Sequence, residues 1–278
     1  MRRSLLNRDA RRAQPPSSRP LSACVAHRKP AEAEGPKSAS LNPRWFTDLG
    51  HRIEQCLARQ PGSQDAKVLR ERLDYLNKHW LELSAGREGF LTGHGWRGLD
   101  KHSVAWGEMD SMVRVALAPR SGHVNNVMHN RYAESARVNW LLRLAAAADP
   151  DHGRQWRELM TPKSVGLILR SIKTDYKLPI TYPDSVTVLH KLARKPDYKS
   201  EAIFLEAVIL SHQHRRPAAR CFEDIAVYDY RAGRRAPLQD FMVHRLRDTY
   251  DSQEESRAEV ESEVWTFKTM RRLKLACM

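Results

Sequence analysis

The strongest constraint on the fold is one long helical segment, apolar on most of its circumference, followed by four strand-like segments. Residues 131–147 are expected to form a helix that is buried nearly all round. Its apolar positions are Ala133, Ala136, Val138, Trp140, Leu141, Leu144 and Ala147. The β-rich runs that follow are SVGLILRSIKTDY, DSVTVLHKLAR, EAIFLEAVILSHQ and ARCFEDIAVYDY. Their short separators favour antiparallel neighbours, so the order predicts an α+β fold with a sheet wrapped around one helix.

Further elements are expected on both sides of this unit. HSVAWGEM, residues 102–109, is predicted as a first strand. Residues 42–93 have apolar side chains at helical spacing, interrupted by PGSQ, and Gly86 is a plausible end for the second helix. A final helix is predicted from Leu238 to Leu273, with a solvated acidic middle, DSQEESRAEVESE.

The N-terminal segment has a different composition from the rest of the chain. The net charge is +14, and the first 40 residues hold nine Lys and Arg against three Asp and Glu. This Arg-, Ser- and Pro-rich stretch is typical of a mitochondrial transit peptide, and an untargeted disordered tail is the alternative. The first interpretation predicts a mitochondrial (matrix) protein, and the second allows a cytoplasmic one.

Several kinds of site and partner are not supported by the sequence. The four cysteines lack CxxC spacing, so we expect free thiols and no metal site. His212 and His214 have no evident third ligand nearby. No apolar run reaches the roughly 18 residues of a membrane span. Basic residues after position 40 are dispersed and lack an aromatic stripe, which argues against nucleic acid as a partner.

The segment around the start of the long helix carries a motif. Removing Val113–Ser121 leaves WGEMDSMGHVNNVMHNRYAESARVNW, in which an acid precedes Gly-His-Val-Asn-Asn. This resembles hotdog-fold acyl-CoA thioesterases of the 4-hydroxybenzoyl-CoA thioesterase type. It also resembles a fungal thioesterase-like group that shares RPAARC and YDYR, over residues 43–255. The resemblance implies a hotdog fold, with extra N-terminal helices and a C-terminal helix.

The same resemblance implies a catalytic site at the start of the helix. Asp110 would be the carboxylate that activates water or attacks the thioester. Backbone amides around Asn126, including those of Val127, Met128 and His129, would stabilise the oxyanion, because N–H groups at a helix N-terminus carry partial positive charge. His123 would hold the loop and the water.

Each of these residues also has a structural interpretation. Asp110 could be a turn residue and His123 a structural histidine. Asn125 and Asn126 could both simply cap the helix, and Asn126 is expected to cap first and to act in catalysis second. Glu134 is the reserve catalytic carboxylate, although an ion pair with Arg131 or Arg137 is its simpler role. Arg215 and Arg216 could contact the phosphates of coenzyme A or lie in a solvated turn.

The chain departs from the motif at one place. The nine residues Val113–Ser121 put Pro119 where the motif requires the acid. Either this insertion loops out and Asp110 still reaches the site, or the site is broken, or the gene model is faulty. His129 occupies a position where relatives often carry an aromatic residue such as Tyr.

These observations leave two functions open. The first is an acyl-CoA hydrolase that needs no cofactor beyond its coenzyme A thioester substrate and forms a homodimer or dimer of dimers. The second is a catalytically silent hotdog protein that serves as a mitochondrial scaffold or assembly subunit.

The expected organisation is a leader at 1–40, a helical preface at 41–100, the hotdog domain at 101–255, and a helix with a basic tail at 256–278. The acyl group is not predicted.

Overall fold

The computed structural model describes residues 44–59, 61–62, 64–109 and 122–274, all of which fall in one unit, Asn42–Met278. Its centre is an antiparallel sheet with the strand order β1-β3-β4-β5-β2, and a short β6 pairs with β5. The strands are β1 (Arg97–Ser103), β2 (Val165–Tyr176), β3 (Ser185–Leu192), β4 (Ala202–Ser211), β5 (Arg216–Asp229) and β6 (Arg234–Arg235). The four predicted β-rich runs are therefore confirmed as β2 to β5. The expected pairing of consecutive strands holds for β3, β4 and β5 and is wrong for β2, which pairs with β5 and not with β3.

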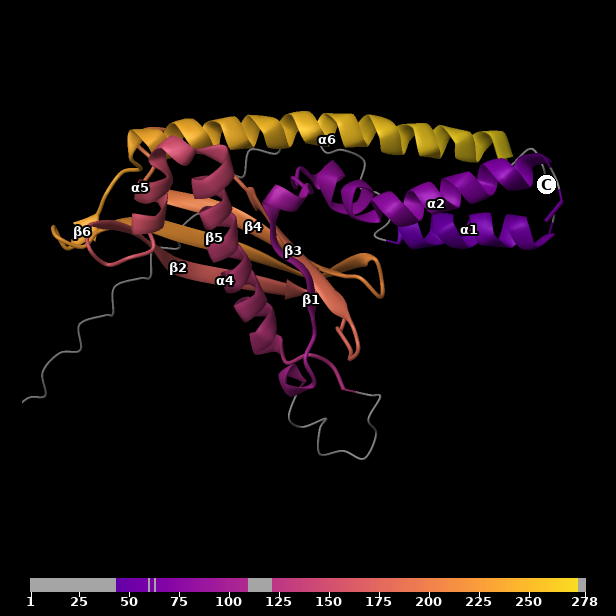
Figure 1. The fold of residues 1–278 in the computed structure, drawn as a ribbon, viewed down its shortest axis with the longest axis horizontal. Coiled ribbons are helices and arrows are strands. Elements are labelled where there is room, and N and C mark those ends of the chain that lie inside the picture. The colour runs from indigo at the N-terminus through magenta and orange to yellow at the C-terminus, as the bar shows by residue number, and fades with distance from the viewer. Residues whose placement is uncertain (1–43, 60, 63, 110–121, 275–278) are drawn as a thin grey trace, which may run out of the picture. The chain divides into compact units, whose positions relative to one another are not determined.

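The long helix α4 (Asn126–Arg143) lies across one face of this sheet, as Figure 1 shows. It continues into a π-helical turn, Leu144–Ala148. The sheet and this helix confirm the hotdog architecture. The helix is not buried all round, however, because the sheet covers one side only: Val138 and Leu142 remain 38% and 37% exposed.

The first strand is displaced from its predicted position. Residues 106–108 form a 3-10 turn, and β1 covers Arg97–Ser103 instead. Its place is set by tertiary packing, since a Cβ on Gly98 would lie 2.3 Å from the carbonyl oxygen of Ala136 in α4. Only a glycine allows the helix backbone to approach the strand this closely.

The core consists of two apolar clusters along α4. Tyr132, Ala133 and Ala136 pack with β3, β4 and β5 near the start of the helix. Trp140, Leu141 and Leu144 pack with the other end of the sheet, with α5 (Gly153–Glu158) and with the first turns of α6 (Asp240–Lys274). The sheet therefore holds α4 along its length and fixes the position of its N-terminus.

The predicted helical preface and the C-terminal helix both form. The preface contains α1 (Trp45–Arg59), α2 (Gln64–Ala85), which ends directly before Gly86, and a 3-10 turn η1 (Gly86–Glu88). Its last turn, η1, packs on the sheet face opposite α4, where Glu88 pairs with Arg220 and the carbonyl oxygen of Glu88 accepts from Lys191 Nζ at 2.6 Å.

The C-terminal helix α6 (Asp240–Lys274) runs past the sheet and then beside the preface (Figure 1). Gln253, within its acidic middle, is buried and hydrogen-bonds both backbone groups of Leu192, at 3.0 and 3.2 Å. The predicted boundary at 255/256 therefore falls inside a continuous helix, and that at 100/101 falls inside β1.

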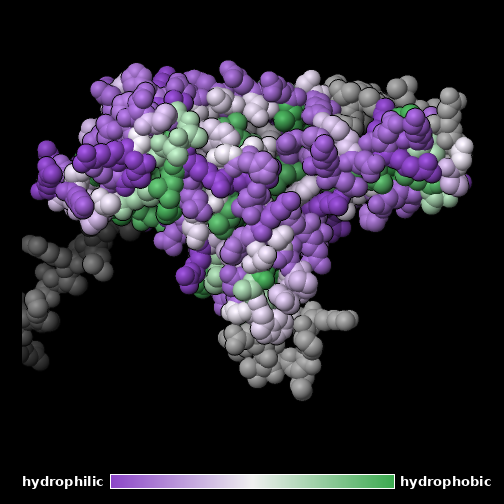
Figure 2. Space-filling model, in the orientation of Figure 1, coloured by the Kyte–Doolittle hydropathy of each residue, from purple (hydrophilic) through white to green (hydrophobic). Residues whose placement is uncertain are grey.

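The visible surface is mostly hydrophilic, and its apolar areas are separate patches (Figure 2). Among the helices that the structure describes, none is long and apolar enough to cross a membrane.

Candidate functional site

The N-terminus of α4 is capped by Asn125. Its Oδ1 accepts a hydrogen bond from Val127 N–H at 3.0 Å, and its carbonyl oxygen accepts from Met128 N–H at 2.9 Å. Of the two amides predicted as possible caps, Asn126 is instead the first residue of the helix, and its side chain is exposed. The correction follows from the backbone: Asn125 has φ −57° and ψ 137°, the extended geometry that lets a side chain bond back to the second N–H of the helix.

Three chain segments converge on this capped end. Asn125 N–H donates to the carbonyl oxygen of Glu108 at 3.0 Å, and Val124 N–H donates to that of Ile180 at 2.8 Å. Val124 also forms an antiparallel bridge with Met109, as His123 does with Thr181. Met109 and Val124 thus hold the two ends of residues 110–121 together beside α4.

Asp110 and the Val113–Ser121 insertion, including Pro119, lie outside the described residues.

A half-buried acid, Glu108, connects this segment to the side chain of Tyr132 in α4. Its Oε2 accepts from Tyr132 O–H at 2.6 Å and from Ala105 N–H at 2.8 Å, and its Oε1 lies 3.8 Å from His102 Nε2. Burial and the bond to Glu108 raise the pKa of Tyr132, so the phenol stays protonated and keeps donating. Glu108 was missed from the sequence, although WGEMDS shows it two residues before Asp110.

His129 lies one turn into α4 and is buried. Its ring packs edge-on against Tyr176, with centroids 5.2 Å apart, and the Tyr176 hydroxyl donates to the carbonyl oxygen of Asn126 at 3.2 Å. The His129 Nδ1 lies 3.4 Å from the carbonyl oxygen of Asn125, which can only accept, so Nδ1 carries the proton. Burial lowers the pKa of His129, which makes the neutral imidazole with a basic Nε2 the form present at neutral pH.

The other residues predicted for this site are distributed unevenly around it. His123 and Val127 are exposed beside the helix N-terminus, and Met128 is half-buried there. Glu134 is exposed further along α4. Its predicted partner Arg137 turns instead to the sheet, where NH1 donates to Glu223 Oε1 at 2.6 Å, because Glu223 is buried and needs a counter-charge.

The two arginines proposed for phosphate contact lie at the turn between β4 and β5. Arg215 is exposed and donates to Asn77 Oδ1 of α2, and Arg216 begins β5. Gln213 of the same turn bonds Asp184 and Thr181 near the α4 N-terminus, so the turn is at the same end of the sheet. His212 Nε2 shares a hydrogen bond with Thr187 Oγ1 at 2.8 Å. Within the described ranges, no three potential metal ligands come together.

A comparison with known protein families identifies the family to which the chain belongs. The profile of the thioesterase-like superfamily matches residues 104–246, which is more than half of the chain. The chain belongs to the thioesterase-like superfamily. The matched region begins just after β1, contains α4 and β2 to β5, and ends in the first turns of α6. The α1–α2 preface of this thioesterase-like protein lies outside it.

Several solved structures resemble the chain at low sequence identity. A thioesterase from Thermus thermophilus, solved with coenzyme A and Zn, is 21% identical, with a TM-score of 0.41 over 59% of this chain and 98% of that one. The PA5185 protein from Pseudomonas aeruginosa is 18% identical, with a TM-score of 0.42 over 60% of this chain and 94% of that one. The SAV2348 protein from Staphylococcus aureus, solved with CoA, is 14% identical, with a TM-score of 0.42 over 55% and 82%. No curated protein matches the chain.

Proposed function

We propose that this thioesterase-like protein hydrolyses an acyl-CoA or related thioester at the N-terminus of α4. The observation that carries the proposal is the pairing of Met109 with Val124, together with the 3.0 Å bond from Asn125 N–H to Glu108. These contacts hold the chain that leads into Asp110 against the positively polarised end of the helix. The family match supports the same chemistry.

In the proposed reaction Asp110 acts as general base. It removes a proton from water as the water oxygen bonds to the thioester carbonyl carbon, and the carbonyl electrons move onto oxygen. The C–S bond then breaks, the thiolate takes the proton from Asp110, and the acid and the free thiol leave. Direct attack by the Asp110 carboxylate, with an anhydride intermediate that water hydrolyses, is the second route.

Asn126 N–H is the best candidate for the oxyanion donor. It donates to no acceptor among the described residues, whereas Val127 and Met128 N–H are bonded to Asn125. A preorganised N–H at a helix terminus stabilises charge that develops in the transition state. His123, His129 and Glu134 are left with supporting roles, and Arg215 and Arg216 are proposed to contact coenzyme A phosphates.

We also propose that the protein forms a homodimer through β2. This strand ends the sheet, and its second edge pairs with no described strand. It spans twelve residues, and Leu169 and Tyr176 are 37% and 46% exposed on it. Long exposed edge strands readily pair with a second copy.

The test of the hydrolase is a panel of acyl-CoA substrates of increasing chain length, with the released thiol trapped by a chromogenic reagent. We expect turnover for at least one substrate, and Asp110→Asn should lower kcat about 100-fold or more while the protein stays folded. Asp248→Asn is the matched control, because Asp248 is exposed on α6 and outside the site. No turnover with any chain length would reject the hydrolase and leave the scaffold role, whereas equal activity of Asp110→Asn and wild type would reject Asp110 as the base.

A further inference from the structure

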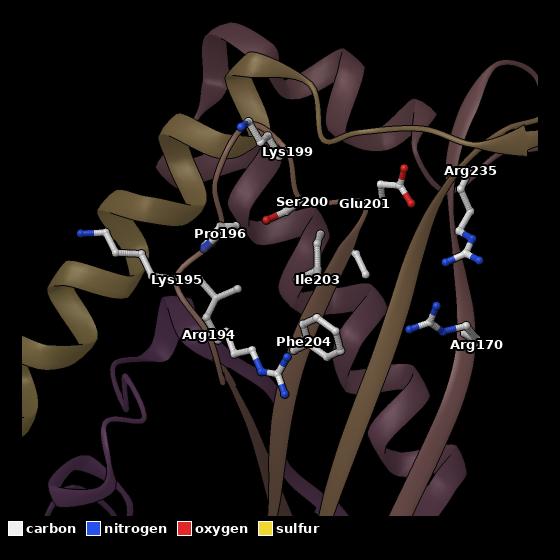
Figure 3. Close-up of a pocket in the computed structure, with 12 residues that line it drawn as sticks. Arg170, Arg194, Lys195, Pro196, Lys199, Ser200, Glu201, Ile203, Phe204 and Arg235 are labelled. Atoms are coloured by element: carbon white, nitrogen blue, oxygen red, sulfur yellow. The ribbon is translucent and has the colours of Figure 1, made fainter. Parts of the chain in front are cut away.

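A basic cavity of about 390 Å³ lies at the end of the sheet where β3 leads into β4 (Figure 3). Ile203 and Leu205 are buried in the cluster beneath α4, so the alternation along β4 puts Phe204 on the opposite face. Phe204 lines the cavity there, beside Asp224, its partner on β5. The cavity is therefore on the face of the sheet that α4 does not cover.

The cavity is also far from the proposed catalytic end. Thr181 and Ile180 meet the N-terminus of α4 just before β3 begins, and the cavity is lined by Leu192, where β3 ends. Eight strand residues span roughly 20 Å or more. A molecule bound in this cavity is therefore too far from the N-terminus of α4 in the same chain to contact the proposed catalytic groups.

Positive charge dominates the lining. Its cationic side chains are Arg170, Arg194, Lys195, Lys199 and Arg235, and among the described lining residues Glu201 alone is acidic. Arg170 is paired with Asp224, and Lys195 with Asp251. Arg194, Lys199 and Arg235 form no ion pair with any carboxylate in the described part of the chain. The cavity thus carries a net positive charge that an anion would neutralise.

Several of these groups are held in place before any ligand binds. The Arg194 guanidinium lies over the Phe204 ring, 4.4 Å from its centroid. Asp224 Oδ2 accepts from both Nε and NH2 of Arg170. Figure 3 shows the guanidinium groups of Arg170 and Arg235 turned toward one another from β2 and β6. Asp224 offsets the charge of Arg170, whereas no carboxylate of the described residues pairs with Arg235 beside it.

The loop that completes the cavity is braced as well. Asp197 Oδ1 accepts from Lys199 N–H at 2.9 Å and from the Ser200 hydroxyl at 3.0 Å. The carbonyl oxygens of Pro196 and Ser200 accept bonds from Arg247 and from Leu238 N–H. This bracing places Lys199 over the cavity on an ordered loop.

We propose that this cavity binds the pyrophosphate group of a nucleotide. Guanidinium groups recognise phosphate oxygens through paired N–H donors, and several cations spread around a cavity suit adjacent phosphates better than a single one. A volume of about 390 Å³ is within the range of small-molecule sites. The proposal does not rest on thioester hydrolysis, because binding is measured without turnover.

The test is isothermal titration calorimetry on the full chain, with inorganic pyrophosphate as the probe and orthophosphate for comparison. We expect saturable binding of pyrophosphate that is tighter than that of orthophosphate. Arg235→Gln should weaken it about tenfold or more, since it removes a charge-assisted contact. Arg234→Gln is the matched control: it removes the same charge from the neighbouring exposed residue of β6, which does not line the cavity, and should change binding less than about twofold.

Titrations with ADP and with coenzyme A show which kind of molecule supplies the pyrophosphate group. Weaker binding of ADP alone in Arg235→Gln assigns the site to a free nucleotide. Equal weakening of coenzyme A binding assigns it to the nucleotide end of the thioester and replaces Arg215 and Arg216 as the contacts of its pyrophosphate. Both results support the site. An absence of saturable pyrophosphate binding to wild type overturns the proposal, as do equal losses in Arg234→Gln and Arg235→Gln, which indicate a general charge effect.

Discussion

Arg137 of α4 donates through NH1 to Glu223 Oε1 of β5 at 2.6 Å, inside the core between the helix and the sheet. The side chains are 10% and 0% exposed. His190 of β3 is buried beside them, with Nε2 3.5 Å from Glu223 Oε2. The bond ties the middle of α4 to the sheet, so it helps to fix where the helix N-terminus lies.

Breaking this pair from one side should destabilise the protein more than removing both charges. Glu223→Leu leaves Arg137 buried and unpaired, and we expect a loss of about 3–5 kcal/mol in the free energy of unfolding. The double variant Arg137→Met with Glu223→Leu should recover much of that loss. Urea unfolding followed by circular dichroism measures both, and a double variant no more stable than Glu223→Leu would contradict the explanation.

The helix cap gives a second prediction. Asn125→Ala removes the acceptor for Val127 N–H and should lower the free energy of unfolding by about 1 kcal/mol. Asn125→Asp keeps an acceptor and should be close to wild type. Asn126→Ala is the matched control and should have little effect, because that side chain is exposed. If Asn126→Ala proved the more damaging change in a urea titration, the cap would be misassigned.

The close packing of β1 against α4 gives a third prediction, which concerns stability. In Gly98→Ala the new Cβ would lie 2.3 Å from the Ala136 carbonyl oxygen and 2.7 Å from the Ala136 Cβ. Neither atom is the end of a flexible side chain, so helix and strand must separate, at about 2–3 kcal/mol. Gly95→Ala, where nothing lies within 4 Å, should change stability by less than about 0.5 kcal/mol. Thermal unfolding compares the two, and similar melting temperatures would rule out the steric explanation.

The buried His129 predicts a dependence of stability on pH. Burial lowers its pKa from 6.5 in the folded protein, so near and below pH 6.5 the unfolded chain binds the proton more readily. The free energy of unfolding should therefore fall as the pH falls through 6.5 toward the folded-state pKa. His129→Gln should lose less stability than wild type between pH 7.5 and 5.5. His212, whose pKa burial also lowers, accounts for part of the remaining slope.

Urea titrations at the two pH values measure this difference. His51→Gln, at an exposed histidine of α1, is the control for removal of a histidine side chain. A His129→Gln slope equal to that of wild type would show that His129 takes up its proton equally in both states.

Individual residues show how far local sequence rules extend. Spacing alone predicted Glu134 and Arg137 as helix neighbours, yet Arg137 bonds Glu223, 86 positions away, because β5 passes beneath that turn of α4. Nothing in WGEMDS distinguishes Glu108, and only its contacts with Tyr132 and Ala105 reveal a structural role. Of the adjacent amides Asn125 and Asn126, backbone geometry alone selects the cap.

The sequence by itself determined the helix, the four strands after it, the antiparallel pairing of β3, β4 and β5, and the family motif at the helix N-terminus, whereas the pairing of β2 with β5 came from the tertiary structure. Periodicity, short turns and a local motif are properties of neighbouring residues, so they can be read along the chain. Tertiary structure alone decided the position of β1, the Arg137–Glu223 pair, the Met109–Val124 bridge and the basic cavity beside Phe204. Each depends on groups far apart in sequence that meet only when the sheet closes against α4, and their distances and burial set the energies.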